Sequence, residues 1–296
     1  MKVGYRCSLC LVNRAYNQIL RATEDRQKRF EALSAVTEML GREFSPDAVP
    51  SLLGAKRDRM IKRITGNPDP YYELKRNANR MALKMLPEVR AFMARQLNKL
   101  ERFRMTCKAA SIGNLIEYDI LGHDAILEDP LELLEKEEFY IDDTESFFKL
   151  AERGGEVLYL MDNAGEIAFD RLLVEEFKRL GCRVTAAVKG GPALNDALME
   201  DALEVGMDEV ADDIITTGTD AIGINLTECS REFLESFYGF QLILSKGMAN
   251  WETLTEIGTP SPTLFLLRVK CEPVAEALHA PMDRSIAKLV PKGFKL

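Results

Sequence analysis

Three short apolar runs in this sequence end in residues that could do chemistry. VLYLM is followed by Asp162 and Asn163, CRVTAAV by Lys189 and then Asp196, and QLILS by Lys246. Carboxylate and amide oxygens are hard ligands that suit Mg²⁺ or Mn²⁺, and ammonium groups bind phosphate. The residue types therefore predict a divalent cation held beside a phosphate group, with no histidine required.

The elements that must position these groups are the strands of a parallel sheet. Such sheets bind ligands at the carboxyl ends of their strands, so we expect the polar residues to meet there. The alternation of β-rich and helical segments after Gly154 is typical of right-handed βαβ units. The expected strands lie within 157–161, 182–188, 208–218, 241–245 and 262–269, and the helices between them within 167–181, 193–206 and 230–239.

Other residues at these strand ends predict how a phosphate is held. Gly165 opens a helix whose backbone N–H groups could take a phosphate oxygen, and Gly247 lets the backbone approach closely. Each polar residue also has an ordinary explanation, since Asp162 or Asn195–Asp196 could cap a helix and the lysines could extend toward solvent. Their recurrence at successive strand ends favours a site.

The first part of the chain has a helical pattern. The sequence predicts a helical region over 1–110, which begins with a Cys-x-x-Cys pair, and an α/β domain over 111–296. The acidic stretch at 128–155 predicts solvated helices. Within the first region we expect helices at 12–22 and 29–40, a stop at Gly41, a helix capped by Asp69 that begins at Pro70, and another that begins at Pro87.

Charge is distributed unevenly along the chain. Residues 1–110 hold 23 Lys and Arg against 11 Asp and Glu, and the remainder holds 16 against 36. Either the basic segment docks on the acidic body, or a basic face guides an anionic substrate. Nucleic acid is not an expected partner, because aromatic residues are not interleaved with the cations and the net charge is −8. No apolar run approaches the roughly 20 residues that span a bilayer, and MKVGYRCSLC lacks an apolar leader core, so we expect no membrane partner and a cytoplasmic location.

The cysteines do not form a disulfide pattern. Of the six, only Cys7 and Cys10 are spaced like metal ligands, and the pair alone is half a zinc site, so a structural role and a metal or redox role both stay open. His123 and His279 lie outside the strand-end loops and are predicted to be surface or core residues.

Five ordered motifs, AASIGNLIEYD, MDNAGEIAFD, VKGGPALNDA, SKGMANWETL and RVKCEPVA, resemble the damage-control phosphatases, domain-of-unknown-function family 89. The CSLC start is similar to the archaeal-type branch. The resemblance covers essentially the whole chain. It implies a three-layer α/β/α Rossmann-like domain with an N-terminal all-helical region. The implied activity is a metal-dependent phosphatase for small phosphorylated metabolites, such as sugar phosphates or phosphopantetheine-type compounds, that uses Mg, Mn, Co or Ni.

The resemblance also implies roles for residues. Asp162, Asn163 and Asp196 correspond to metal ligands and Lys246 to a phosphate-contacting lysine. Glu166 departs from the eukaryotic branch, which has an aromatic residue there, and its role is open. On the substrate side the resemblance implies Asn114 and Lys246, and the positions at the strand ends add Gly165, Lys189, Asn195, Ser245 and Asn250. The candidates for catalysis are Asp162, Glu166 and Lys246.

Phosphomonoester hydrolysis by an activated water is the expected mechanism. Aspartyl-phosphate enzymes carry a second Asp two residues after the nucleophile, and this position is Ala164, which argues against Asp162 as a nucleophile, although Glu166 could act as a base. The alternatives are an S-adenosylmethionine-dependent carboxyl methyltransferase, which should carry a Gly-rich loop after the first strand, and a metal-dependent phosphometabolite-binding protein without turnover. We also expect that Cys271 approaches Cys7 and Cys10 to form a thiol cluster.

Overall fold

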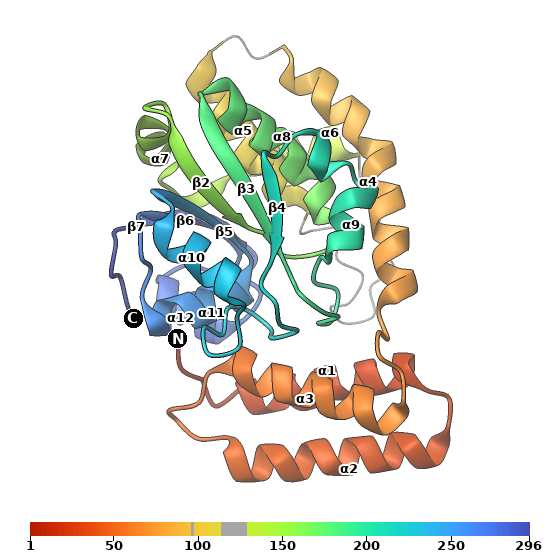
Figure 1. Ribbon diagram of the computed structural model, residues 1–296. Helices are drawn as coiled ribbons and strands as arrows, with labels where there is room; N and C mark the ends of the chain where they lie inside the picture. The colour runs from red at the N-terminus through yellow and green to blue at the C-terminus, as the bar shows by residue number, and fades with distance from the viewer. Residues whose placement is uncertain (96–97, 114–128) are drawn as a thin grey trace.

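The computed structural model describes residues 1–95, 98–113 and 129–296, and its centre is one seven-stranded sheet (Figure 1). The strand order is β1-β7-β6-β5-β2-β3-β4. The strands are β1 (Phe139–Asp142), β2 (Gly155–Leu160), β3 (Cys182–Val188), β4 (Asp213–Thr216), β5 (Leu242–Lys246), β6 (Thr263–Arg268) and β7 (Ser285–Val290).

The sheet is mostly parallel, as expected. The strands from β4 to β6 along the sheet pair in parallel, whereas β7 is antiparallel to β6 and β1 pairs in parallel with β7. From β2 the chain proceeds outward to β3 and β4, and then returns to place β5 on the other side of β2. The boundary between β2 and β5 is therefore the topological switch point, where ligands bind in folds of this kind.

Helices cover both faces of the sheet and form a separate layer near the N-terminus (Figure 1). The helices of the described residues are α1 (Cys7–Ala22), α2 (Arg26–Glu43), α3 (Pro50–Thr65), α4 (Tyr72–Met93), α5 (Lys99–Ile112), α6 (Pro130–Lys136), α7 (Thr144–Ala151), α8 (Glu166–Arg179), α9 (Met199–Glu204), α10 (Arg231–Gly239), α11 (Met248–Ile257) and α12 (Glu272–Leu278).

Two apolar cores enclose the sheet. On one face α4, α5, α7 and α8 pack against alternate strand residues such as Val157 and Leu244, and on the other α10, α11 and α12 pack against Leu158 and Ile243. This alternation is what a sheet covered on both faces requires. The expected three-layer α/β/α fold with helices at its N-terminus is therefore confirmed.

The N-terminal helices divide between two cores. Helices α1, α2 and α3 pack around Ile19, Val36 and Ile61, and Figure 1 shows them as a layer beyond the end of the sheet. Helices α4 and α5 instead contribute Val89 and Phe103 to the large core against α8. The division of the chain at residue 110 stays a prediction.

Several predicted boundaries are wrong. Helix α2 continues past Gly41 to Glu43, and α4 continues through Pro87 to Met93, because burial of its apolar face on α8 outweighs the lost hydrogen bond. Asp69 accepts a hydrogen bond from the Tyr71 amide but is not the cap residue of α4.

Two strands lie where the sequence analysis predicts none. Strand β1 interrupts the acidic stretch at 128–155, and β7 follows the run that was expected to be the last strand. The helix expected over 193–206 also begins later, at Met199, because the preceding residues form the loop that carries Asn195 and Asp196.

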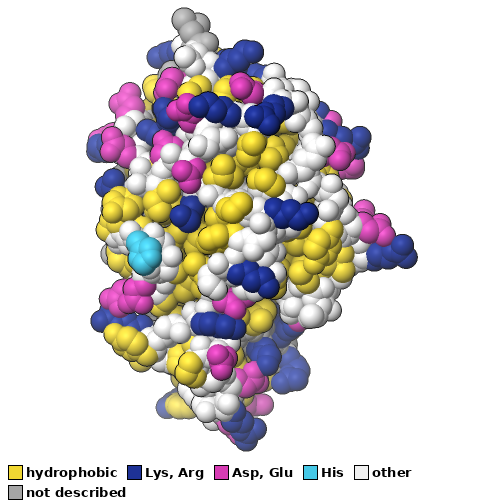
Figure 2. All heavy atoms as spheres, turned by 90° about the vertical axis from the view of Figure 1, so that its left-hand side faces the viewer, with side chains coloured by type: hydrophobic (Ala, Val, Ile, Leu, Met, Phe, Trp, Pro, Cys, Tyr) yellow, Lys and Arg dark blue, Asp and Glu magenta, His cyan; other side chains and the backbone are white. Residues whose placement is uncertain are grey.

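The basic N-terminal helices do dock on acidic partners. Arg90 of α4 pairs with Glu175 at 2.7 Å, and Lys75 of α4 lies 3.5 Å from Asp201. Figure 2 shows one face of the molecule, on which basic and acidic side chains are interspersed. Among the described residues, no helix combines the length and apolar composition that a membrane span needs.

Candidate active site

The loops after β2 and β3 are joined directly at the carboxyl edge of the sheet. Asn163 and Asp196 form an isolated antiparallel bridge. The Ala197 amide donates to the Asp162 carbonyl at 2.8 Å, and the Ala164 amide donates to the Asn195 carbonyl at 3.0 Å. These backbone contacts bring the three predicted metal ligands together, although they come from two different loops.

The side chains of Asp162, Asn195 and Asp196 do not have the helix-capping roles that were considered for them. The cap residue of α8 is Gly165, which has no side chain, so Asp162 does not cap that helix. The cap residue of α9 is Leu198, so Asn195 and Asp196 do not cap it either. Their side chains are therefore not needed to start the helices that follow them.

The donor set fits a hard divalent cation. Nδ2 of Asn163 donates to Oδ2 of Asp162 at 2.9 Å and to Oε2 of Glu166 at 3.0 Å, so the amide oxygen is the atom that Asn163 could offer to a cation. Asn163 and Asp196 are both 5% exposed. Two carboxylates and an amide oxygen are the chemistry that Mg²⁺ and Mn²⁺ prefer.

Gly247 explains how β5 can end beside Asp162. Its φ is +79°, and a Cβ at this position would collide with the Asp162 carboxylate. Only glycine meets both conditions without strain. The loop after β5 therefore closes the switch point against the loop after β2.

Lys246 lies behind this site, in a buried charge cluster. Its Nζ donates to the Ala110 carbonyl at 2.9 Å, to Asp170 at 2.7 Å and to Glu166. These acceptors use the three donors of the ammonium group. Lys246 is 1% exposed and was expected to contact phosphate. In this structure its ammonium group contacts protein acceptors instead.

Burial and neighbouring charges shift the pKa values of this cluster. Burial lowers the pKa of Lys246, but Asp170 and Glu166 outweigh it and raise the pKa above its ordinary value. Burial and the Glu166 charge raise the pKa of Asp170 to about 6, against the opposing effect of Lys246. Tyr159 donates to Asp170 at 2.6 Å, and burial raises the pKa of that phenol well above its ordinary value. The cluster thus consists of the Lys246 ammonium group between the carboxyl groups of Glu166 and Asp170.

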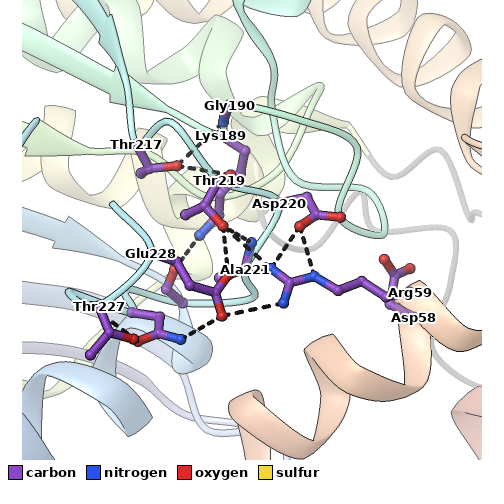
Figure 3. Close-up of polar contacts among 12 residues, drawn as sticks. Asp58, Arg59, Lys189, Gly190, Thr217, Thr219, Asp220, Ala221, Thr227 and Glu228 are labelled. Atoms are coloured by element: carbon purple, nitrogen blue, oxygen red, sulfur yellow. Dashed lines mark hydrogen bonds and ion pairs between the residues drawn. The ribbon is translucent and has the colours of Figure 1, made fainter. Parts of the chain in front are cut away.

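Lys189 connects the acids to a third loop. Its Nζ donates to the Gly223 carbonyl at 2.5 Å and lies 3.5 Å from Oδ2 of Asp196. Figure 3 shows that the loop after β4 is held in turn by Arg59 of α3, which pairs with Asp220 at 2.7 Å and with Glu228. Because Lys189 is only 5% exposed, it does not extend to solvent. It positions Asp196 against the β4 loop.

A cavity of about 420 Å³ opens between this edge of the sheet and helices α1 and α3. Its walls include Asp162, Asn163, Asn195 and Asp196 from the predicted set. The predicted residues that do not line it are Gly165, Glu166, Lys189, Ser245, Lys246 and Asn250. Asn114 lies outside the described residues.

Two of the buried substrate-side candidates, Gly165 and Asn250, have contacts within the protein. The Gly165 amide donates to Oδ1 of Asn79 at 2.7 Å, so this N–H is not free for a phosphate. Nδ2 of Asn250 donates to the Lys246 carbonyl at 2.9 Å, and Ser245 is fully buried. Gly165 and Asn250 thus contact other parts of the protein, whereas Oγ of Ser245 is a buried hydroxyl without a hydrogen-bond partner among the described residues.

Sequence reasoning missed Asn79, Asp170, Tyr159 and Arg57. Asn79 bridges Gly165 to Asp201 at 2.9 Å, and its signal in the sequence is a polar residue on an otherwise apolar helix face. Asp170 has a similar signal, since it lies one turn after Glu166 on a helix whose neighbouring residues are buried. Arg57 and Tyr159 have no signal that separates them from ordinary helix and strand residues.

The cysteines and histidines do not complete a metal site. Cys7, Cys10 and Cys271 line the same cavity, but within the described ranges no three His, Cys, Asp or Glu side chains are grouped to hold a metal ion. The predicted thiol cluster is thus near the site but is not assembled as a metal centre. His279 is exposed, as expected, and His123 lies outside the described residues.

The fold and the site define a class: a doubly wound α/β protein with a cluster of carboxylate and amide side chains at its switch point, covered by N-terminal helices. Comparison with known proteins identifies the family. The model of the damage-control phosphatase ARMT1-like domain matches residues 3–286. The chain belongs to this family.

Similar proteins come from archaea. The chain is 38% identical to an uncharacterised protein of Methanocaldococcus jannaschii over 97% of its length and 95% of the relative. It is 35% identical to a damage-control phosphatase of Pyrococcus horikoshii, in a match that covers 95% of this chain and 96% of the relative. The crystal structure of a DUF89 family protein from P. horikoshii superposes with a TM-score of 0.87 at 32% identity over 99% of each chain. The resemblance seen in the five motifs is confirmed.

Proposed function

We propose that this protein is a divalent-metal-dependent phosphatase that hydrolyses small phosphorylated metabolites in a damage-control role. The observation that carries the proposal is the convergence of Asp162, Asn163 and Asp196 on one cavity at the switch point. Membership of the damage-control phosphatase family supports the reaction class. Sugar phosphates and phosphopantetheine-type compounds are the first substrates to test.

Asp162, Asn163 and Asp196 would hold the cation, with Mg²⁺, Mn²⁺, Co²⁺ and Ni²⁺ as candidates. When bound, the cation would offset charge on the phosphate oxygens and lower the pKa of a water, so that the water could lose a proton and act as the nucleophile. The protein's part is to fix the oxygens in advance. Asn163 is oriented by its two bonds to carboxylates, and Asp196 is oriented by Lys189.

Glu166 acts through Asn163 in this proposal. It accepts a hydrogen bond from Asn163 at 3.0 Å and is paired with Lys246, so it is a positioning residue rather than the general base. Lys246 forms a buried ion pair with Glu166, and it reaches a phosphate only if it leaves these acceptors. The nucleophile is water, because Ala164 stands where an aspartyl-phosphate enzyme has its second acid.

Phosphate release from a metabolite panel tests the proposal, with the chelated protein supplied with each metal in turn. Asp162→Asn and Asp196→Asn should abolish release, and Glu166→Gln should reduce it by about 10- to 100-fold, as expected for a group that orients a ligand. Asp208→Asn is the matched control, because Asp208 is an exposed acid away from the cavity.

Three outcomes would contradict parts of the proposal. Substantial metal-dependent release by Asp162→Asn would remove Asp162 from the site. Metal-dependent binding of phosphometabolites without release would identify a binding protein instead of an enzyme. A phosphorylated Asp162 trapped with a slow substrate would replace water by the carboxylate as nucleophile.

A further inference from the structure

Arg57 of α3 is a buried cation with no hydrogen-bonded partner among the described residues. It is 1% exposed, and within these residues its Nε is a buried donor without an acceptor. In the part of the chain that the structure describes, no hydrogen bond or ion pair joins Arg57 to another residue. A guanidinium group stays charged in proteins, and a buried charge without a partner is costly. Such a group is expected where a ligand supplies the missing anion.

Arg57 lines the same cavity as the proposed metal ligands. It lies on the wall formed by α1 and α3, whereas Asp162, Asn163 and Asp196 form part of the wall at the sheet edge. A volume of about 420 Å³ is in the range of pockets that enclose a whole small molecule and not only a phosphate group. A substrate whose phosphate lies at the sheet edge therefore has its remaining part against α3.

The other charged side chains on this wall are matched. Arg6 pairs with Glu272, and Arg14 interacts with the buried carboxyl of Glu252, which also accepts a hydrogen bond from Ser51. Asp58, next to Arg57, is used by Lys62 at 2.7 Å and by Gln18 at 2.7 Å. Burial and the like charge of Arg14 lower the pKa of Arg57, and the nearby Tyr71 and Asp58 only partly oppose this.

Helix α3 is held rigidly enough to present this group. Arg59 ties it to Asp220 and Glu228 of the β4 loop (Figure 3), and Lys62 donates to the Pro192 carbonyl at 2.5 Å. Both contacts join α3 to loops that belong to the sheet edge. A fixed, planar donor fork recognises carboxylate or phosphate with little loss of conformational entropy.

We propose that Arg57 is a specificity determinant that binds a second anionic group of the substrate, a carboxylate or a second phosphate. This inference rests on the proposed phosphatase function and narrows its substrates to phosphomonoesters with two separated anionic groups. Arg57 thus determines which phosphomonoester is preferred and takes no part in the chemical step.

Paired substrates test the proposal with the full-length, metal-loaded protein. The pairs are 3-phosphoglycerate with glycerol 3-phosphate, and fructose 1,6-bisphosphate with fructose 6-phosphate, and p-nitrophenyl phosphate serves as a substrate without a second anion. The first member of each pair should have a kcat/KM about 10- to 100-fold higher, the value of a charge-assisted contact. The two pairs distinguish a carboxylate from a phosphate as the preferred second anion.

Arg57→Met should abolish this preference while p-nitrophenyl phosphate turnover changes by less than about threefold. The variant should have a Tm at or above that of the wild type, because it removes an unpaired buried charge. Arg57→Lys keeps the charge without the fork and should retain part of the preference. Arg63→Met is the control, since Arg63 is exposed on the same helix.

The proposal is wrong if the wild type shows no preference for a second anion, or if Arg57→Met slows all substrates equally. It is also wrong if both Arg57 variants unfold, since Arg57 would then be needed for the fold itself. Absence of phosphate release from every substrate would refute the phosphatase function instead. In that case calorimetric titration of the same compounds into the wild type and Arg57→Met still tests the anion contact.

Discussion

Replacing Lys246 with methionine would leave two buried carboxyl groups without the ammonium group that lies between them. Glu166, Asp170 and Lys246 are each at most 1% exposed, so water cannot replace the lost partner. Breaking a buried ion pair by removing one partner costs about 3–5 kcal/mol. We therefore expect Lys246→Met to lower the free energy of unfolding by about this amount at pH 8.

Urea unfolding followed by tryptophan fluorescence measures this change. The single tryptophan, Trp251, is fully buried against Phe265 with ring centroids 4.9 Å apart, so its signal reports loss of the core. The matched control is Lys178→Met, on the same helix as the two acids. Lys178 is 38% exposed where it pairs with Asp212, and its loss should cost about 1 kcal/mol or less.

The dependence of this cost on pH gives a second check. In Lys246→Met the Asp170 carboxyl group avoids burial of charge by taking up a proton, so the destabilisation should be smaller at pH 5 than at pH 8. Adding Asp170→Asn should restore part of the stability, with a coupling energy of about 0.5–3 kcal/mol. If Lys246→Met unfolds within about 1 kcal/mol of the wild type at pH 8, the lysine is not the counter-ion we describe.

Three further perturbations test other parts of the structure. Gly247→Ala should destabilise the protein by about 1–3 kcal/mol and weaken metal binding, because the added Cβ would collide with Asp162. The control is Gly41→Ala, at an exposed helix position with open space around it, which should stabilise the protein by up to about 1 kcal/mol. Urea unfolding measures both changes in stability, and metal titration measures the change in binding. Arg59→Ala should cost about 1 kcal/mol, with a smaller difference from the wild type in 1 M NaCl, since its ion pairs are partly exposed. The pKa of Asp170 in the folded state, about 6, is above its ordinary value of 3.8, so the folded state binds this proton more tightly than the unfolded state does. The contribution of Asp170 to stability therefore falls as pH rises from about 4 to 6. Asp170→Asn should flatten that part of the curve of stability against pH, and an unchanged slope would contradict the raised pKa.

The sequence pattern predicts the parallel part of the sheet because each of these strands is a local apolar run. It does not predict β1 and β7, whose pairing joins residues far apart in the chain. Phe139 pairs with Ser285, and neither segment has the continuous apolar composition of a central strand. The prediction that a new helix begins at Pro87 is wrong for a related reason. The local preference of proline to interrupt a helix is outweighed by the packing of α4 on α8, which a local sequence pattern does not show.

The site shows the same limit at the level of single residues. The convergence of Asp162, Asn163 and Asp196 is predictable because a parallel sheet brings its strand ends to one edge. The partners of Lys246 are not predictable, because Asp170 is 76 residues away and is set on the facing side of α8 only by tertiary packing. A lysine at a strand end next to a glycine has the same local pattern whether it contacts a phosphate or a buried carboxylate.

The charge arrangement at the switch point has two layers that Asn163 connects. Asp162, Asn163 and Asp196 face the cavity, and Glu166, Lys246 and Asp170 lie behind them without lining it. One amide group bonds to a carboxylate in each layer, at 2.9 Å to Asp162 and at 3.0 Å to Glu166. Because the rear layer is buried and its ammonium group is saturated, it holds Glu166, and through it Asn163, in a fixed orientation before any ligand enters. On this reasoning Lys246 supports the site from behind. The site then depends not only on DNAGE but also on Asp170, one helix turn further along α8, and on Lys246 at the end of β5, although neither residue lines the cavity.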